Sequence, residues 1–259
     1  MWVIFLCARI IIEFLMPYIL AIDSGNSYVK WGLFNHGRWL RQGKVFYEQI
    51  LCLKKDFKDL IIPEKIVISH VARGITKNQI CEQISFWPVV PLWIRSHSFQ
   101  CGVSNGYSDF SQLGCDRWAA LIAAWKMQRH ACLVINVGSA VTIDALSDSG
   151  KFLGGIILPG FQMMLKSLQQ GTQLIDADMD QYEDFPVCTN SAIHSGIIDS
   201  LVGAIERMYN LLSIRIDHPV EKCIISGGGA SLLIPFIKIP IKAIDNLVLE
   251  GLIVIAEDS

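Results

Sequence analysis

The stretch ILAIDSGNSYVKWGLF (19–34) decides the fold, because a second stretch, LVINVGSAVTIDAL (133–146), repeats its pattern. Each has an apolar strand, a polar residue at its end, a glycine two positions on, small hydroxyl or amide residues, and a second strand. Asp23 and Asn136 are the equivalent points. A duplication at this spacing predicts two similar domains whose first hairpins can face each other, with a ligand cleft between them.

Short apolar runs alternate with helical patterns along the rest of the chain. The runs lie at 18–22, 64–69, 131–137 and 220–226, and the helical patterns lie at 48–60, 75–86, 112–129, 189–212 and 246–257. Strands separated by helices indicate α/β architecture. Within 112–129, Trp118, Leu121, Ile122 and Trp125 recur at helical spacing and predict a buried stripe. We expect an N-terminal domain over 16–115 and a C-terminal domain over 116–259.

The composition excludes several classes of protein. Of 259 residues, 52% are hydrophobic, so the chain is not a disordered or fibrous protein. Lys and Arg number 22 against 24 Asp and Glu, so the net charge offers no field that would gather nucleic acid or anionic lipid. Any anion that this chain binds must be held by a local site, and we expect no nucleic-acid partner.

The N-terminal 22 residues are strongly apolar, but Arg9 and Glu13 interrupt them and no small-residue cleavage site follows. We therefore expect no membrane span. Met16 comes just before Pro17 and the first strand, so residues 1–15 are interpreted as an N-terminal extension from an early start codon. Eight cysteines are scattered with no CxxC pair, which favours the reduced thiols of a cytoplasmic protein.

The segment DSGNSYVK (23–30) has the residues of a phosphate cradle. Asp23 at the strand end can hold a metal-bound water, and Gly25 lets backbone N–H groups approach an anion. Asn26, Ser27 and Lys30 add donors. An ordinary hairpin turn could have the same residues, and alone that simpler interpretation would be preferred.

The segment NVGSAVTID (136–144) repeats this chemistry and strengthens the prediction. Gly138 gives access, and Ser139 and Thr142 offer hydroxyl groups. Two such turns at the spacing of a domain repeat indicate that each can bind different phosphates of one nucleotide.

The segment GYSDFSQLGCDRWAALIAAW (106–125) places Asp116 and Arg117 at the start of a helix. Asp116 could simply complement the helix dipole beside a solvated Arg117. Alternatively, Asp116 accepts a proton from a substrate hydroxyl and Arg117 binds an anionic group of that substrate. Spacing alone leaves both interpretations open. Two further segments, GGIILPG (154–160) and SGGGA (226–230), are typical of strand-to-helix transitions.

These motifs together resemble the type III pantothenate kinases, of the acetate and sugar kinase, chaperone ATPase and actin superfamily. The resemblance runs from about residue 18 to 254 and lies in the order of DSGNSYVK, Tyr107, LGCDRWAALIAA (113–124), NVGSAVTID, GGIILPG, TNSAIHSGI (189–197), SGGGA and DNLVLEGL (245–252). It implies two duplicated ribonuclease H-like, actin-like ATPase domains with a nucleotide cleft between them. It also implies an alcohol phosphotransferase that phosphorylates the primary hydroxyl of pantothenate with ATP, the first step of coenzyme A biosynthesis.

The resemblance also implies roles for individual residues. Asp116 would be the proton acceptor, and Asp23 would hold magnesium through a water molecule. The ATP-binding residues would be Asp23, Ser24, Gly25, Asn26, Ser27, Tyr28, Val29, Lys30 and Ser139. The pantothenate pocket would comprise Tyr107, Gly114, Cys115, Asp116, Arg117 and Thr189, the last contributed across a homodimer interface. A monovalent cation, potassium or ammonium, would bind near Asn136.

Two residues depart from the family pattern. The family usually has an aspartate at Asn136, and its loss predicts a weaker cation site. Gly229 likewise replaces an aspartate at the end of the glycine run, which predicts looser contact with the nucleotide. Two alternatives stay open: another small-molecule kinase of the same fold, and a catalytically drifted homologue that acts as a regulatory accessory factor.

Overall fold

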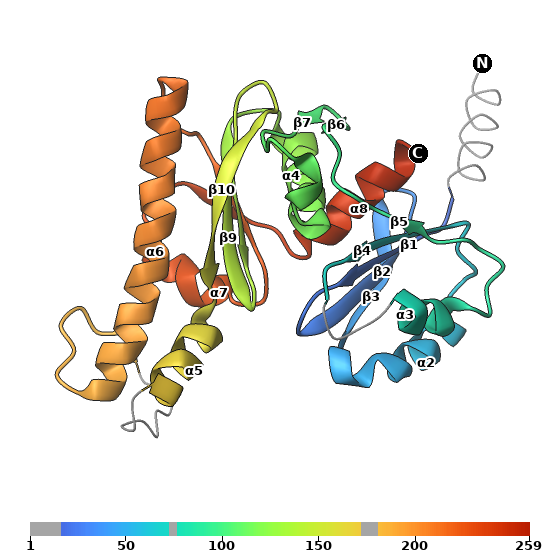
Figure 1. Cartoon of the computed structure of the whole chain (residues 1–259), viewed down its shortest axis with the longest axis horizontal. Helices are drawn as coiled ribbons and strands as arrows, with labels where there is room; N and C mark the ends of the chain where they lie inside the picture. Colours follow the sequence, from blue (N-terminus) through green and yellow to red (C-terminus); the bar gives the residue numbers. More distant parts are fainter. Residues whose placement is uncertain (1–16, 73–76, 172–180) are drawn as a thin grey trace, which may run out of the picture. The chain divides into compact units, whose positions relative to one another are not determined.

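The computed structural model describes residues 17–72, 77–171 and 181–259 (Figure 1). The chain divides into two compact units. The first runs to Ser96 and adds Ser111–Ala123 and Val248–Ser259, and the second comprises His97–Phe110 and Ala124–Leu247. The extension predicted at 1–15 lies outside the described residues. The domain boundaries predicted from the sequence stay a prediction.

A mixed sheet of five strands forms the centre of the first unit, in the order β3-β2-β1-β4-β5. Its strands are β1 (Ile19–Ser24), β2 (Tyr28–Asn35), β3 (Arg38–Phe46), β4 (Lys65–His70) and β5 (Leu92–Trp93). The first three are antiparallel neighbours, whereas β4 runs parallel to both β1 and β5. The ends of β1 and β4 therefore lie at the same edge of the sheet.

The second unit has the same sheet, in the order β10-β9-β8-β11-β12. Its strands are β8 (Cys132–Val137), β9 (Ala140–Leu146), β10 (Phe152–Pro159), β11 (Cys223–Ser226) and β12 (Ile241–Ala243), with the same relative directions. Asp23 pairs with Ser69 on β4, and Asn136 pairs with Ser226 on β11. The internal repeat and the equivalence of Asp23 and Asn136 are therefore confirmed.

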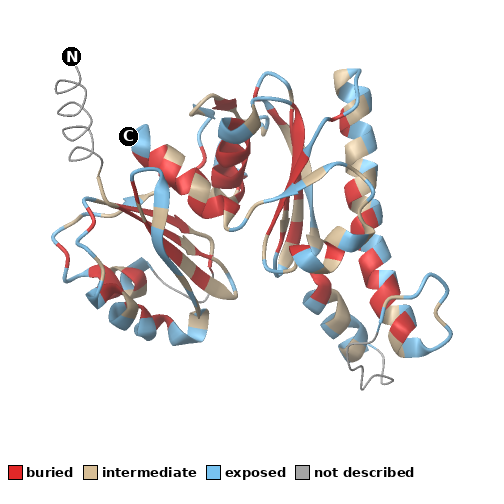
Figure 2. Ribbon diagram, turned by 180° about the vertical axis from the view of Figure 1, so that it is seen from behind, coloured by how far each residue is buried: buried red, intermediate tan, exposed pale blue. Residues whose placement is uncertain are grey.

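Helices cover the first sheet through a dense apolar core. The chain passes from η1 (Tyr47–Cys52) into α2 (Leu53–Lys58), and α3 (Lys77–Ile84) follows β4. Leu20, Ile22 and Trp31 of the sheet pack with Phe57 and Ile80 of these helices. The Trp31 and Phe57 rings meet edge to face at 5.3 Å. Figure 2 shows buried positions along the strands of the sheets and on the helices that cover them.

The long helix α6 (Thr189–Ile216) covers the second sheet (Figure 1). Its buried residues recur at helical spacing and pack with Leu133, Ile135 and Val141 of the strands. Asp217 ends the helix in the left-handed conformation, at φ 61°. The smaller elements of this unit are the β6 (Phe99–Gln100) and β7 (Val103–Ser104) pair, η2 (Phe110–Gln112), α5 (Phe161–Gly171), α7 (Ala230–Leu233) and η3 (Ile234–Phe236).

Residues 117–125 of helix α4 (Cys115–Gln128) are all buried, and its last turn is exposed. The stripe predicted over 118–125 is confirmed, and the helix is covered on its other sides as well. Helix α8 (Leu247–Glu257) packs so closely on α4 that a Cβ at Gly251 would overlap the backbone of Ala119. No helix of the described part of the chain is both long and apolar enough to cross a membrane.

Two glycine-to-alanine substitutions should change stability in opposite directions. Gly251→Ala should destabilise the fold by about 1–3 kcal/mol, because the added methyl group meets backbone atoms of α4 that cannot give way. Gly203→Ala, on the exposed side of α6, should stabilise it by about 0.5–1 kcal/mol, since a Cβ there meets no atom of the described residues within 4 Å. Thermal unfolding measures both, and equal effects of the two changes would contradict the packing.

Candidate functional site

The candidate site of the first unit lies where β1, β4 and the first turn of α4 come together. Asp23 and Ser69 are neighbours across the parallel pair of strands. The Cys115 thiol lies 3.5 Å from Ser69 Oγ and donates to the carbonyl oxygen of His70 at 3.6 Å. The end of β4 therefore holds the start of α4, and Asp116 lies within electrostatic range of Asp23.

Asp23 is a buried carboxyl group that is costly to ionise. Burial and, to a smaller extent, the negative charge of Asp116 raise its pKa from 3.8 to about 7, although the Lys30 charge and a hydrogen bond with Ser69 oppose the rise. Its Oδ1 atom is buried with no hydrogen-bond partner among the described residues. An unpartnered carboxylate oxygen beside a second carboxylate suits a divalent cation or a water molecule bound to one.

Asp116 is held in place by its own neighbours. The Arg117 N–H donates to Asp116 Oδ1 at 2.8 Å. Burial raises the pKa of Asp116, although that hydrogen bond and the Arg117 charge lower it. A Cβ at Gly114 would come within 2.5 Å of Asp116 Oδ1, so any larger residue at position 114 would displace the Asp116 carboxylate. Arg117 is 7% exposed, which rules out the solvated arginine of the simpler interpretation.

Each of the two hairpin turns is closed by a hydrogen bond of the same kind. The Gly25 N–H donates to the Tyr28 carbonyl at 3.0 Å, and the Gly138 N–H donates to the Ala140 carbonyl at 3.0 Å. These two amides therefore shape their turns. Among described atoms, a Cβ would meet nothing closer than 3.4 Å at Gly25 or 3.6 Å at Gly138. Packing does not require glycine at either position, which fits an anion that approaches the backbone closely.

Two other glycine segments brace the second hairpin. The Gly160 N–H donates to the Ser139 carbonyl at 2.9 Å, and a Cβ at Gly160 would overlap the Gly138 carbonyl oxygen. Gly227 has a φ of +102°, and its Cβ would overlap the Val137 carbonyl. Both segments lead from a strand into a helix, as predicted. They fix the turn that carries Ser139.

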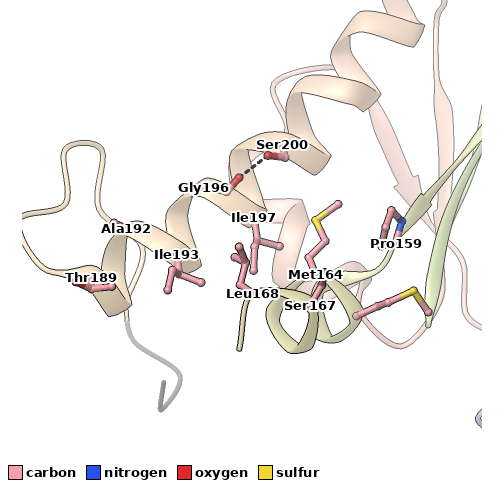
Figure 3. A pocket seen from close by; sticks show the side chains of 11 residues that line it. Pro159, Met164, Ser167, Leu168, Thr189, Ala192, Ile193, Gly196, Ile197 and Ser200 are labelled. Atoms are coloured by element: carbon pink, nitrogen blue, oxygen red, sulfur yellow. Dashed lines mark hydrogen bonds between the residues drawn. The ribbon is translucent and has the colours of Figure 1, made fainter. Parts of the chain in front are cut away.

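Tyr107 and Thr189 belong to the second unit. The Tyr107 N–H is bonded to Asn105 Oδ1 at 3.0 Å, and its ring packs on Phe152 at 5.3 Å. Thr189 begins α6 and lines a mostly apolar hollow of about 810 Å³ with residues such as Met164, Leu168 and Ile193 (Figure 3). This hollow lies between α5 and α6, and its apolar walls suit a hydrophobic contact.

The structure thus gathers the predicted site residues into two groups. The first unit holds Asp23–Lys30, Gly114, Cys115, Asp116 and Arg117, and the second holds Tyr107, Asn136, Ser139 and Thr189. How the two groups meet on one nucleotide stays a prediction.

The sequence interpretation missed Ser69 and His70 at the end of β4. His70 Nδ1 is hydrogen-bonded to Ser24 Oγ at 3.1 Å, and burial, with the nearby Lys77 charge, lowers the pKa of His70. Its ring meets Trp93 edge to face at 5.9 Å. The sequence did contain a signal for them. Ser69 and His70 directly follow the apolar residues of a predicted strand, and the end of a strand parallel to β1 lies beside the end of β1.

Asp23→Asn should stabilise the metal-free protein at alkaline pH. The raised pKa means that the folded chain holds the proton more tightly than the unfolded chain, so stability falls as pH rises from about 4 to 7. At about 1.4 kcal/mol for each factor of ten in proton affinity, the gain above pH 7 should be about 4 kcal/mol. At acid pH the gain should vanish.

Thermal unfolding in EDTA across this pH range makes the measurement. The control is Asp59→Asn, which changes an exposed carboxylate of the same unit. A loss of stability in Asp23→Asn that is the same at every pH would contradict the prediction.

Two solved structures share this fold at low sequence identity. A Campylobacter jejuni protein described as a Baf family transcriptional activator aligns over 92% of this chain and 98% of its own, with 23% identity and a TM-score of 0.57. The acetate kinase of Porphyromonas gingivalis aligns over 93% and 99%, with 12% identity and a TM-score of 0.51. Both support the actin-like ATPase fold that the sequence predicted.

Sequence comparison identifies the family. The type III pantothenate kinase of Nitrosospira multiformis is 44% identical over 243 residues, covering 94% of this chain and 92% of the relative. That of Nitrosomonas eutropha is also 44% identical over 243 residues, covering 93% and 95%. The family model for type III pantothenate kinases matches residues 19–211. With this match over most of its length, and with the predicted motifs on the predicted strands and helix, the chain belongs to the type III pantothenate kinase family.

Proposed function

We propose that this chain transfers the γ-phosphoryl group of ATP to the primary hydroxyl of pantothenate, the first step of coenzyme A biosynthesis. The observation that carries the proposal is the pair of half-buried carboxyl groups with raised pKa values, Asp23 near the end of β1 and Asp116 at the start of α4. Asp23 is suited to binding a metal nucleotide, and Asp116 is suited to accepting a proton. The cytoplasmic location predicted from the cysteines is part of the same proposal.

Asp116 acts as the general base. The pantothenate hydroxyl oxygen forms the new bond to the γ-phosphorus, its proton passes to Asp116, and ADP leaves with the electrons of the broken bond. Burial raises the pKa of Asp116, which makes it a stronger base than an exposed aspartate. Arg117, buried beside it, pairs with the pantothenate carboxylate.

Asp23 would hold the magnesium of the nucleotide through a water molecule, since its buried Oδ1 has no hydrogen-bond partner among the described residues. When bound, magnesium neutralises charge on the phosphates that ATP supplies. Lys30, whose charge already acts on Asp23, adds a second positive group at the same turn. Ser139 of the second hairpin contacts other phosphates of the same nucleotide.

Asn136 should weaken the monovalent-cation site without abolishing it. It occupies the position equivalent to Asp23, at the end of β8, and offers a neutral amide oxygen in place of a carboxylate. Potassium or ammonium should therefore bind with lower affinity than at an aspartate.

A homodimer is part of the proposal. The hollow beside Thr189 is continuous with apolar side chains such as Met163, which is 50% exposed, and Leu168, which is 40% exposed. Apolar surface of this kind is typical of protein interfaces. The molar mass in solution tests this part, and a mass of one chain would contradict it.

The drifted regulator is the weaker candidate. The solved structure described as a transcriptional activator is 23% identical, so its likeness shows the fold alone. A regulator would have no need of a half-buried acid beside a buried arginine at the start of α4.

The decisive assay follows ATP consumption with and without pantothenate. We expect ADP formation that depends on pantothenate and requires a divalent cation. Potassium or ammonium should stimulate it at high concentration because Asn136 binds them weakly. A different small-molecule kinase would consume ATP only with another alcohol. A regulator would show no turnover with any of these additions.

Asp116→Asn should fold normally and lose about two to four orders of magnitude in kcat, because the amide cannot accept the proton. Binding of Mg²⁺–ATP should be unchanged. Gly114→Ala should lower kcat less, since its methyl group would displace the carboxylate without removing it. Steady-state kinetics with thermal unfolding as a check on folding makes the comparison. A wild-type rate in Asp116→Asn would place the proton acceptor elsewhere.

A further inference from the structure

Ser69 belongs to none of the sequence motifs, yet its hydroxyl contacts both sides of the site. It is fully buried, at 0% exposure, one residue before the end of β4. A side-chain hydrogen bond joins it to Asp23, and its Oγ lies 3.5 Å from the Cys115 thiol. The serine therefore lies between the strand that carries Asp23 and the helix that carries Asp116.

We propose that Ser69 is a positioning residue, whose hydroxyl orients the Asp23 carboxylate toward the metal nucleotide and links it to the first turn of α4. The inference rests on the proposed function in one respect: it takes Mg²⁺–ATP as the ligand of Asp23.

The chemistry of the three groups gives the hydrogen bonds a direction. Once Asp23 is ionised, its carboxylate can only accept, so the Ser69 hydroxyl then donates its one proton to Asp23. Ser69 Oγ is then left to accept, and the single Cys115 thiol proton has two acceptors in reach, Ser69 Oγ at 3.5 Å and the His70 carbonyl oxygen. That thiol also faces the His70 carbonyl at 3.6 Å, so β4 holds the start of α4 through two adjacent residues.

Comparison of the two repeats shows that the serine equivalent to Ser69 has a different hydrogen-bond partner in the second unit. Ser226 occupies the equivalent position on β11 and pairs with Asn136. Its Oγ accepts the backbone N–H of Leu247, the first residue of α8, at 3.2 Å. In the second unit, where Asn136 replaces the aspartate, Ser226 therefore accepts a hydrogen bond from the start of a helix. In the first unit, Ser69 is hydrogen-bonded to the Asp23 carboxylate.

The hydroxyl also determines which part of Asp23 stays available. Ser69 anchors the carboxylate, while Oδ1 keeps no hydrogen-bond partner within the described ranges. Without the anchor, the carboxylate can rotate away from the metal-bound water. The cost should fall on binding of the metal nucleotide and spare pantothenate, because Cys115 keeps its contact with His70.

The test uses Ser69→Ala, Ser69→Thr and the control Ser96→Ala. Ser96 is also a buried serine of the first unit, and its Oγ donates to the Leu113 carbonyl at 2.7 Å. Binding of Mg²⁺–ATP without pantothenate is followed by ligand-observed NMR. KM and kcat are measured for both substrates, and thermal unfolding reports on the fold.

We expect Ser69→Ala to weaken binding of Mg²⁺–ATP about tenfold, the usual effect of losing one hydrogen bond to a charged group. The KM for pantothenate should stay unchanged, and Ser69→Thr, which keeps the hydroxyl, should restore the affinity. Ser96→Ala should lower the unfolding temperature without changing nucleotide affinity.

Wild-type nucleotide affinity in Ser69→Ala, with a loss of stability like that of Ser96→Ala, would overturn the inference. If Ser69→Ala does not fold, Ser69→Cys gives the same comparison, since a thiol is a weak donor. A wild-type chain that binds Mg²⁺–ATP but leaves pantothenate unchanged would contradict the proposed function and leave the role of Ser69 testable by binding. A wild-type chain that binds no Mg²⁺–ATP would overturn the inference directly.

Discussion

Two half-buried carboxyl groups, Asp23 and Asp116, lie close enough that the Asp116 charge makes Asp23 more costly to ionise. Burial is the larger cause for both, and the Asp116 charge adds to it at Asp23. A protein gains no stability from such an arrangement. The proposed function accounts for the arrangement. A bound cation would offset the negative charge of the two carboxylates, and a substrate hydroxyl would need one of them as a base.

The duplicated sheet explains how one scaffold supplies two different turns. One residue before the end of β1 and of β8, each sheet has a polar residue opposite a serine, which is Asp23 in the first unit and Asn136 in the second. The loop between the hairpin strands has three residues in the first unit and two in the second. Both turns are closed by a hydrogen bond from a glycine N–H, whereas only the first unit has the carboxylate. This difference between the two units fits the proposal that the first turn binds the metal ion and the second turn contacts phosphates.

Much of this was predictable from local sequence. The alternating elements, the repeat and the buried stripe of α4 are periodic signals, and they hold in the structure. Ser69 and His70 were missed because their importance comes from the parallel pairing of β4 with β1, which brings together residues 46 positions apart. The requirement for Gly114, Gly160 and Gly251 comes from close approaches to atoms that sequence cannot place. The strand β3 and the helix α5 also went unpredicted, since their apolar residues are mostly exposed or half-buried.

The most direct test of the buried carboxyl pair is an NMR titration of the aspartate side-chain carbons in the metal-free protein. Asp23→Asn and Asp116→Asn would identify the two resonances. The account predicts that the Asp23 carboxyl titrates near pH 7, far above the ordinary 3.8, and that magnesium with ATP lowers its pKa. An Asp23 carboxyl that titrates with the exposed aspartates, and does not respond to the metal nucleotide, would contradict it.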